Sequence, residues 1–297
     1  MKTVEVHTLR AFTKENQGGN PAGVVLNAEH MGEADMQQTA RVLGFSETAF
    51  IQSSACADWK IRFFTPNDEV DVCGHATIAA FSLLKAQQIA ECGMHTMETK
   101  AGVLEVEVRE DGLVFLTQTL PHFAEQVDRR HIAASLRLQP EDLMEDLPVQ
   151  IVSTGLRDIL VPVRSLAVLQ SIEPDMTQIT EMSKAYGAVG YHVFALDTDT
   201  GAVARCRNFA PLYDIPEESA TGTATGALSS YLYEYGKIAA EQAHSLVFEQ
   251  GYTMHCPSEI RVKLHTDPRG RIASVQVGGR TSTAEVRRII LPLNLAE

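Results

Sequence analysis

The chain has little of what marks a secreted, membrane or nucleic-acid-binding protein. Its 297 residues include five cysteines in an odd, scattered set without Cys-x-x-Cys spacing, which gives no zinc or redox signature and suits a reducing compartment. No apolar run reaches the roughly 18 residues needed to span a bilayer. Basic residues are too few for a nucleic-acid or anionic-membrane partner, because 25 Lys and Arg stand against 38 Asp and Glu. We therefore expect a cytoplasmic globular protein.

One local pattern occurs twice in the sequence. Arg-Phe-Phe-Thr-Pro at 62–66 is matched by Arg-Asn-Phe-Ala-Pro at 207–211, with Arg, Phe and Pro each displaced by 145 residues. Cys-Gly-His-Ala-Thr-Ile-Ala at 73–79 is matched by Thr-Gly-Thr-Ala-Thr-Gly-Ala at 221–227, displaced by 148 residues. Each copy reads as a strand, a break at proline, an acidic loop and a glycine that begins an apolar helix. The repeat predicts two similar domains with a site in the cleft between them.

The helices of the two repeats indicate the architecture. Predicted helices at 73–88 and 220–235 carry apolar or small residues around the whole axis, and such a helix must be buried all round. Strands outnumber helices in both halves. The sequence therefore predicts an α+β fold of two similar domains, each a mostly antiparallel or mixed sheet curled round a central helix. Two ordinary α/β layers are the alternative. We place the first domain at 1–117 with a C-terminal strand at about 284–297, and the second domain at 118–283.

Other segments have clear local signals. Helices are predicted at 34–43 and at 176–186, and each is followed by a glycine that can end it, Gly44 or Gly187. The glycine-rich stretch at 18–23 lacks the lysine and the glycine spacing of a phosphate-binding loop, so we expect a tight turn there.

The first residues of the two repeated helices form a candidate binding site. Gly74 and Gly222 begin these helices, where the first N–H groups have no partner within the helix and the macrodipole adds partial positive charge. Two such helix starts on opposite sides of a cleft could hold a small carboxylate. The alternative is that Thr221 and Thr223 only cap their helix and no ligand binds.

Several titratable residues lie near these helix starts in the sequence. Glu47 interrupts an apolar, strand-like stretch, so it either faces the cleft with a raised pKa suited to proton transfer or lies on a solvent-exposed strand face. His75 could move a proton or simply be a satisfied histidine at a helix start. The acidic residues before the two helices are equally ambiguous between catalysis and stabilisation of the helix dipole: Asp68, Glu69, Asp71, Glu217 and Glu218.

Taken together, the motifs resemble those of the phenazine-biosynthesis PhzF-like isomerases, which have the diaminopimelate-epimerase-like fold. The resemblance runs nearly end to end and rests on five segments: Gly-Asn-Pro-Ala-Gly at 19–23, Ser-Glu-Thr-Ala at 46–49, Phe-Thr-Pro at 64–66, Glu-Val-Asp with Cys-Gly-His-Ala-Thr at 69–77, and Glu-Glu-Ser-Ala-Thr-Gly-Thr-Ala at 217–224. It implies an isomerase without a cofactor or a metal, usually a homodimer, with its active site in the cleft between the domains.

The resemblance also assigns residue roles. Glu47 corresponds to the family's acid/base, with His75 and Glu218 as further catalytic residues. Substrate binding is expected from Asn20, Cys73, Gly74, Gly222 and Thr223. The sequence departs from the family pattern in having glutamate for aspartate at 218, serine for proline at 219 and threonine for serine at 223. The additional methylene at Glu218 would intrude into a small site, which leaves the substrate open.

Three functions remain compatible with these residues. The first is an isomerase that moves a proton within a small carboxylated substrate, such as a cyclic, anthranilate-like acid, with general acid–base catalysis by Glu47. The second is an amino-acid racemase or epimerase with Cys73 as one base, although Thr221 stands where a second cysteine would be. The third is a non-catalytic protein that binds a small molecule.

Overall fold

The computed structural model describes residues 2–291, which form two compact units. The first unit contains residues 2–116 and 278–291, and the second contains residues 117–277. The strand expected at about 284–297 is β18 (Glu285–Leu291), and residues 292–297 of that expectation lie outside the described part of the chain.

The first unit is a mixed sheet whose strands alternate between antiparallel and parallel pairing. Its strands are β1 (Lys2–Ala11), β2 (Asn20–Val25), β3 (Glu47–Gln52), β4 (Trp59–Phe64), β5 (Glu69–Val70), β6 (Gly93–Thr99), β7 (Gly102–Val108), the start of β8 (Val114–Gln118), and β18. Along the sheet β1 pairs antiparallel with β2, β2 parallel with β3, β3 antiparallel with β4, β4 parallel with β6 and β6 antiparallel with β7. The short β5 pairs antiparallel with the end of β4.

The second unit repeats this pairing order. Its strands are β9 (His122–Gln126), β10 (Gln150–Ser153), β11 (Arg157–Pro162), β12 (Gly190–Ala195), β13 (Ala204–Ala210), β14 (Ile215–Glu218), β15 (Leu246–Gln250), β16 (Ser258–Thr266) and most of β17 (Ile272–Gly279). Along this sheet β10 pairs antiparallel with β11, β11 parallel with β12, β12 antiparallel with β13, β13 parallel with β15 and β15 antiparallel with β16. The short β14 pairs antiparallel with β13. The repeat in the sequence is thus a repeat of strand topology.

In each unit the sheet curls round one long helix, as predicted. Helix α2 (Gly74–Ala86) contacts β1, β2, β3 and β7, and helix α6 (Gly222–Glu234) contacts β10, β11 and β16. Burial extends round both helices, since residues 75–81 of α2 and residues 224–232 of α6 are buried without a break. The α+β architecture inferred from the apolar circumference of these helices is confirmed.

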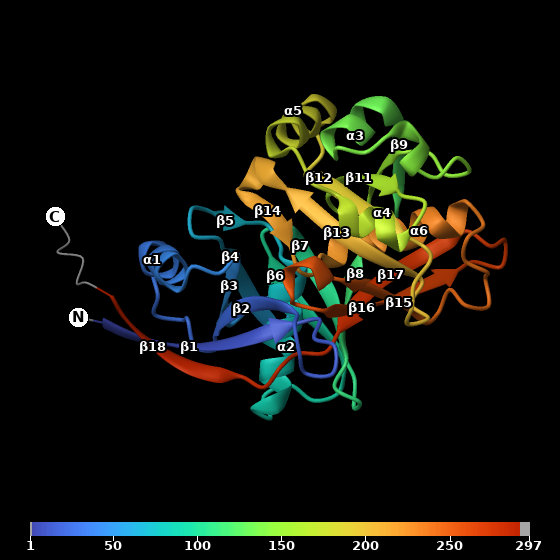
Figure 1. The fold of residues 1–297 in the computed structure, drawn as a ribbon. Coiled ribbons are helices and arrows are strands. Elements are labelled where there is room, and N and C mark those ends of the chain that lie inside the picture. The colour runs from blue at the N-terminus through green and yellow to red at the C-terminus, as the bar shows by residue number, and fades with distance from the viewer. Residues whose placement is uncertain (1, 292–297) are drawn as a thin grey trace. The chain divides into compact units, whose positions relative to one another are not determined.

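The other face of each sheet is covered by amphipathic helices. In the first unit α1 (Glu33–Leu43) packs Met36 and Ala40 into a core with Val6 and Phe50. In the second unit α3 (Arg129–Ser135), α4 (Leu166–Ser171) and α5 (Met176–Tyr186) cover β11 and β12, as Figure 1 shows. Three short 3₁₀ turns lie within residues 2–291, at Pro140–Asp142, Pro211–Tyr213 and Tyr252–Met254. Strand residues therefore alternate between this outer core and the face that meets the central helix.

Local signals predicted the helices better than the short strands. Gly44 and Gly187 both adopt left-handed conformations, with φ of 71° and 58°, and end α1 and α5 as expected. The turn expected at 18–23 is wrong in its second half, because strand β2 begins at Asn20. The acidic loops before α2 and α6 also contain short strands, β5 and β14, which the sequence did not indicate. None of the helices within residues 2–291 is long and apolar enough to cross a membrane.

Replacement of Gly190 by alanine is expected to destabilise the second unit. A Cβ atom at Gly190 would lie 2.0 Å from the carbonyl oxygen of Phe209 on β13, and a backbone atom in a sheet cannot move aside cheaply. Overpacking of this kind costs about 1–3 kcal/mol or more. The denaturant midpoint of Gly190→Ala should therefore fall. Gly32→Ala is the control, because a Cβ there meets nothing within 4 Å; equal midpoints for the two variants would contradict the close approach.

Candidate active site

In the first unit, three chain segments bring predicted site residues together. Asn20 is the first residue of β2, Glu47 is the first residue of β3, and Cys73 and His75 flank the first residue of α2. Because β2 and β3 run parallel with Ala22 opposite Glu47, both strands begin at the same edge of the sheet. The start of α2 lies at this edge, so residues 55 positions apart in the sequence come into contact.

The imidazole of His75 is the centre of this cluster. Its Nδ1 atom lies 3.3 Å from Cys73 Sγ and 3.5 Å from Asn20 Nδ2. Its Nε2 atom lies 3.3 Å from Ser46 Oγ and 3.3 Å from Glu47 Oε2. Donation from Asn20 to Nδ1 places the hydrogen of the neutral ring on Nε2, where it faces Glu47. We call Asn20, Ser46, Glu47, Cys73 and His75 the His75 cluster.

Glu47 is sheltered from water, which decides against a solvent-facing strand position. Its side chain is 16% exposed, and that of His75 is 6% exposed. Burial raises the pKa of the Glu47 carboxyl, while hydrogen bonds from Ser46 and Cys73 act in the opposite direction. The Oε2 atom is buried and accepts no hydrogen bond of good geometry from residues 2–291, although His75 Nε2 is close. A carboxyl whose pKa is raised by burial is better suited to take up and then release a proton than one exposed to water.

The start of α2 adds partial positive charge to the cluster. Gly74 is the first helical residue, and the capping residue Cys73 is extended, with φ of -137°. The Cys73 side chain makes no capping hydrogen bond to the helix, so its thiol is directed to the His75 ring instead. The N–H groups in the first turn of α2 point toward the position at which an anionic group of a ligand can bind a helix start.

In the second unit, Glu218 is held in place by the residues at the start of α6. Thr221 Oγ1 donates to Glu218 Oε2 over 2.5 Å, and Gln250 Nε2 donates to the Glu218 carbonyl oxygen over 2.7 Å. Thr221 occupies the N-cap position of α6, but its side chain makes no hydrogen bond to the helix backbone. Gly222 begins α6, and the carbonyl oxygen of Thr223 accepts from Thr154 Oγ1 over 3.1 Å.

The neighbouring acidic residues have structural partners in both units. Arg62 binds both carboxylate oxygens of Glu69, at 2.7 and 2.8 Å, and Arg207 binds both oxygens of Glu217, at 2.9 and 2.9 Å. Such a bidentate pair ties a short strand to its neighbour and satisfies both charges. The repeated arginines thus explain the acidic residues at 69 and 217 as partners in ion pairs.

Sequence reasoning missed one buried carboxyl, Asp158. It lies opposite Gly190 in the parallel pair of β11 and β12, just as Ala22 lies opposite Glu47 in the pair of β2 and β3. Gly190 on β12 therefore corresponds in position to Glu47 on β3. In the second unit the buried carboxyl belongs instead to Asp158, on the neighbouring strand β11. Burial, together with the charge of Glu218, raises the pKa of Asp158 to about 8. The sequence signal was an aspartate at the start of a wholly apolar strand.

A buried pair of polar side chains lies on the same sheet face as Asp158. His192 and Asn208 stand opposite each other on β12 and β13, and Asn208 Nδ2 lies 3.2 Å from His192 Nδ1. Burial lowers the pKa of His192 to about 3, so that this ring is neutral at physiological pH. His192 is consequently a structural histidine, unlike His75, which contacts a carboxyl.

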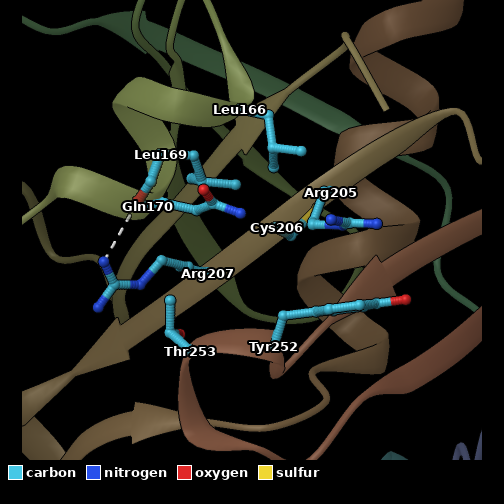
Figure 2. Close-up of a pocket in the computed structure, with 8 residues that line it drawn as sticks. All are labelled: Leu166, Leu169, Gln170, Arg205, Cys206, Arg207, Tyr252 and Thr253. Atoms are coloured by element: carbon cyan, nitrogen blue, oxygen red, sulfur yellow. Dashed lines mark hydrogen bonds between the residues drawn. The ribbon is translucent and has the colours of Figure 1, made fainter. Parts of the chain in front are cut away.

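The second unit also contains a cavity of about 290 Å³ away from these residues (Figure 2). Leu166 and Leu169 of α4 line one side, and Arg205 and Arg207 of β13 line another. Both arginines already bind carboxylates, because Arg205 donates to Glu249 over 3.1 and 2.8 Å and Arg207 is paired as described above. The guanidinium of Arg205 also lies over the ring of Tyr252, at 3.9 Å. Because both guanidinium groups are already paired with carboxylates, they do not make the cavity a site for an anionic substrate.

The described residues contain one group of three or more potential metal ligands. Glu47, Cys73 and His75 each place a ligand atom within 4.8 Å of the other two. The sequence did not reveal this group as a motif, because Glu47 is far from the other two along the chain. No metal site was expected from the cysteine spacing.

Comparison with known proteins gives a consistent result. The profile of the phenazine biosynthesis-like protein family matches residues 9–287. An uncharacterized isomerase of Bacillus subtilis is 35% identical over 97% of this chain and 99% of its own length. The trans-2,3-dihydro-3-hydroxyanthranilate isomerase of Pseudomonas chlororaphis is 28% identical over 84% of this chain and 86% of its own length.

A solved structure shows the same fold. The crystal structure of a PhzF-family phenazine biosynthesis protein from Bacillus anthracis superimposes with a TM-score of 0.90 at 31% identity, and covers 98% of this chain and 100% of its own. The repeated topology, the His75 cluster and these similarities lead to one conclusion: the chain belongs to the phenazine biosynthesis-like, or PhzF-like, family of isomerases.

Proposed function

We propose that this protein isomerises a small carboxylated substrate by cofactor-free proton transfer at Glu47. The observation that carries the proposal is the contact between the sheltered Glu47 carboxyl and His75, at 3.3 Å. In this mechanism Glu47 removes a proton from a carbon atom of the substrate and returns a proton at another carbon on the same face. A single group can do both when it is held rigidly, and while it carries the proton its carboxyl exchanges hydrogen with the solvent.

The remaining predicted residues have supporting roles in the proposal. His75 donates its Nε2 hydrogen to Glu47 or to a substrate oxygen, and Asn20 fixes the ring through Nδ1. The N–H groups at the start of α2, beginning with Gly74, bind the substrate carboxylate. Glu218, Gly222 and Thr223 are predicted to assist catalysis and binding from the second unit. A homodimer and a cytoplasmic location also remain predictions.

For the substrate, we propose a cyclic acid that carries an acidic C–H next to a double bond. The Pseudomonas chlororaphis relative is named for a dihydrohydroxyanthranilate, which is a compound of this class. The substrate of the present protein is expected to differ in size, because Glu218 stands where the family has the shorter aspartate.

A two-base racemase is the second candidate, and the contact between Cys73 Sγ and His75 Nδ1 at 3.3 Å is the observation in its favour. A thiol hydrogen-bonded to imidazole can act as a base. The residue at the matching helix start is Thr221, whose hydroxyl donates to Glu218 and which is far less acidic than a thiol. We therefore favour the reaction with one carboxyl as its acid/base.

Solvent deuterium incorporation tests the proposed function. Small cyclic and acyclic carboxylic acids are incubated with the enzyme in deuterated water and analysed by mass spectrometry and NMR. An isomerase is expected to yield a product with a shifted double bond, and with deuterium only at the carbon that receives the proton. Inversion at one stereocentre with deuterium at that centre, lost in Cys73→Ser, would support the racemase instead. Binding without any exchange would contradict both reactions.

A further inference from the structure

The His75 cluster holds three different ligand atoms at the separations of a tetrahedral metal site. His75 Nε2 lies 3.3 Å from Glu47 Oε2 and 4.0 Å from Cys73 Sγ. Zinc binds sulfur at about 2.3 Å and nitrogen or oxygen at about 2.0–2.2 Å, which in a tetrahedron separates N from O by about 3.4 Å and S from N by about 3.6 Å. The N–O separation matches this geometry and the S–N separation is about 0.4 Å longer than it, and all three ligand atoms lie within 4.8 Å of one another.

The surroundings of these atoms also suit a cation. Cys73 is 7% exposed and His75 is 6% exposed, so a bound ion would be shielded from water on the protein side. Glu47 Oε2 is a buried carboxylate oxygen for which residues 2–291 provide no hydrogen bond of good geometry. Burial of a carboxylate is costly, and a metal ion bound at this oxygen would offset that cost.

The donor set selects the kind of metal. A thiol and an imidazole are soft and borderline ligands, which favour zinc and related transition metals, whereas magnesium and calcium require mainly oxygen ligands. The cluster provides one carboxylate, so it does not fit those two ions. Three protein ligands also leave a fourth position for water.

The second unit provides an internal comparison. Thr221 and Thr223 stand at the matching helix start where the first unit has Cys73 and His75. Gly190 occupies the place of Glu47. All three ligand positions are thus occupied by residues that are not zinc ligands, so the helix start of the second unit does not repeat this ligand set.

We propose that Glu47, Cys73 and His75 form a site for Zn²⁺, and that bound Zn²⁺ stops the reaction. Binding converts the Cys73 thiol to a thiolate, and the released proton goes to the solvent. The ion occupies the carboxylate oxygen and the imidazole nitrogen that proton transfer requires. The inhibitory part rests on the proposed function of Glu47, whereas metal binding does not.

Cobalt substitution tests the binding part without any substrate. The experiment uses the full chain with its more accessible thiols replaced, Cys56→Ser, Cys92→Ser and Cys256→Ser. Added Co²⁺ is expected to give a near-ultraviolet thiolate-to-cobalt band and intense visible bands of tetrahedral cobalt, saturating at one metal per chain. Added Zn²⁺ should abolish these bands by displacement. A spectrum of octahedral cobalt without the thiolate band would overturn the proposal.

Two single substitutions locate the site. Cys73→Ser in the same background should remove the thiolate band, and Glu47→Gln should weaken cobalt binding while the band remains. Circular dichroism shows whether each variant is folded. The background itself is the matched control and should keep the band, because its Cys56→Ser change removes a thiol that also has a carboxylate neighbour, Glu98, at 3.6 Å but is exposed and outside the three-ligand group. A band that survives in folded Cys73→Ser would show that the metal binds elsewhere.

The inhibitory part is measured separately as deuterium exchange into a confirmed substrate. One equivalent of Zn²⁺ should abolish exchange by the wild-type enzyme, and EDTA should restore it. If Co²⁺ and Zn²⁺ bind at Cys73 while exchange continues, the inhibitory part is wrong and the role of Glu47 fails with it. If exchange depends on Glu47 but no metal binds, the metal site is wrong and the proposed function stands.

Discussion

Replacement of Glu47 by glutamine is expected to lower the turnover of a confirmed substrate by about 10²–10⁴, the usual contribution of a general acid–base. Glutamine has nearly the same shape and can still receive hydrogen bonds from Ser46 and Cys73, but its amide cannot take up a proton. In the wild type His75 Nε2 lies 3.3 Å from a carboxylate oxygen of Glu47. In the variant it would face the side-chain amide of the glutamine. Rate constants for isomerisation and for deuterium incorporation should fall together.

Stability separates this catalytic effect from a structural one. Because burial raises the pKa of Glu47, its ionised form costs folding free energy, and the neutral glutamine removes that cost. Glu47→Gln should therefore unfold at the same temperature as the wild type or at a higher one. Glu110→Gln, at an exposed position, is the control and should change neither rate nor stability. Full turnover by Glu47→Gln would exclude Glu47 as the acid/base.

The parts of the fold that depend on local signals could be predicted from the sequence. The apolar circumference of α2 and α6 requires burial on all sides, and the glycines at 44 and 187 end their helices by left-handed caps. The repeated Arg–Phe–Pro segments pointed to duplicated topology. These signals are local because they depend on side chains and backbone angles within a few turns of chain.

Features that depend on strand pairing could not be predicted. Asn20 lies in a glycine- and proline-rich stretch that reads as a turn, yet pairing with β1 and β3 makes it the first residue of a strand. Strands β5 and β14 are acidic and only a few residues long, and their register is supported by Arg62 and Arg207 from the strand next to them. No periodicity exists in such short segments from which to infer a strand.

The candidate site shows the same division. Glu47, Cys73 and His75 could be selected as candidates because of their residue types and positions near a helix start. Their contact depends on β3 and α2 meeting at one edge of the sheet, which only the structure shows. Asp158 was missed because its significance depends on the register between β11 and β12.

Asp158 leads to the second prediction: replacement by asparagine is expected to stabilise the protein, and more strongly at alkaline than at acidic pH. The pKa of this carboxyl rises from 3.8 to about 8, first because of burial and second because of the charge of Glu218. Between pH 3.8 and about pH 8 the folded chain therefore keeps a proton that the unfolded chain releases. Because of this difference, the free energy of unfolding falls as the pH rises from the lower value to the higher one.

The size of the effect follows from the shift. Each pKa unit corresponds to about 1.4 kcal/mol, so the folding free energy lost between the two pKa values is on the order of 5 kcal/mol. Asparagine does not titrate and avoids this loss. Unfolding by denaturant should show a small stabilisation of Asp158→Asn at about pH 5 and a much larger one at about pH 9, where the wild-type carboxyl would ionise in the folded state.

Asp267 provides a control of opposite sign. Its pKa is lowered, first by the backbone N–H of Arg271 and then by the Arg271 side chain, and its side chain is partly exposed to solvent. Its ionised form therefore contributes stability above the unfolded pKa, and this contribution is lost as the pH falls through the folded pKa. Asp267→Asn should be no more stable than the wild type at about pH 9, whereas Asp158→Asn should be clearly more stable. If both variants shift the midpoint in the same direction at that pH, the carboxyl of Asp158 ionises in the folded protein without cost, and the side chain must then have a partner for its charge.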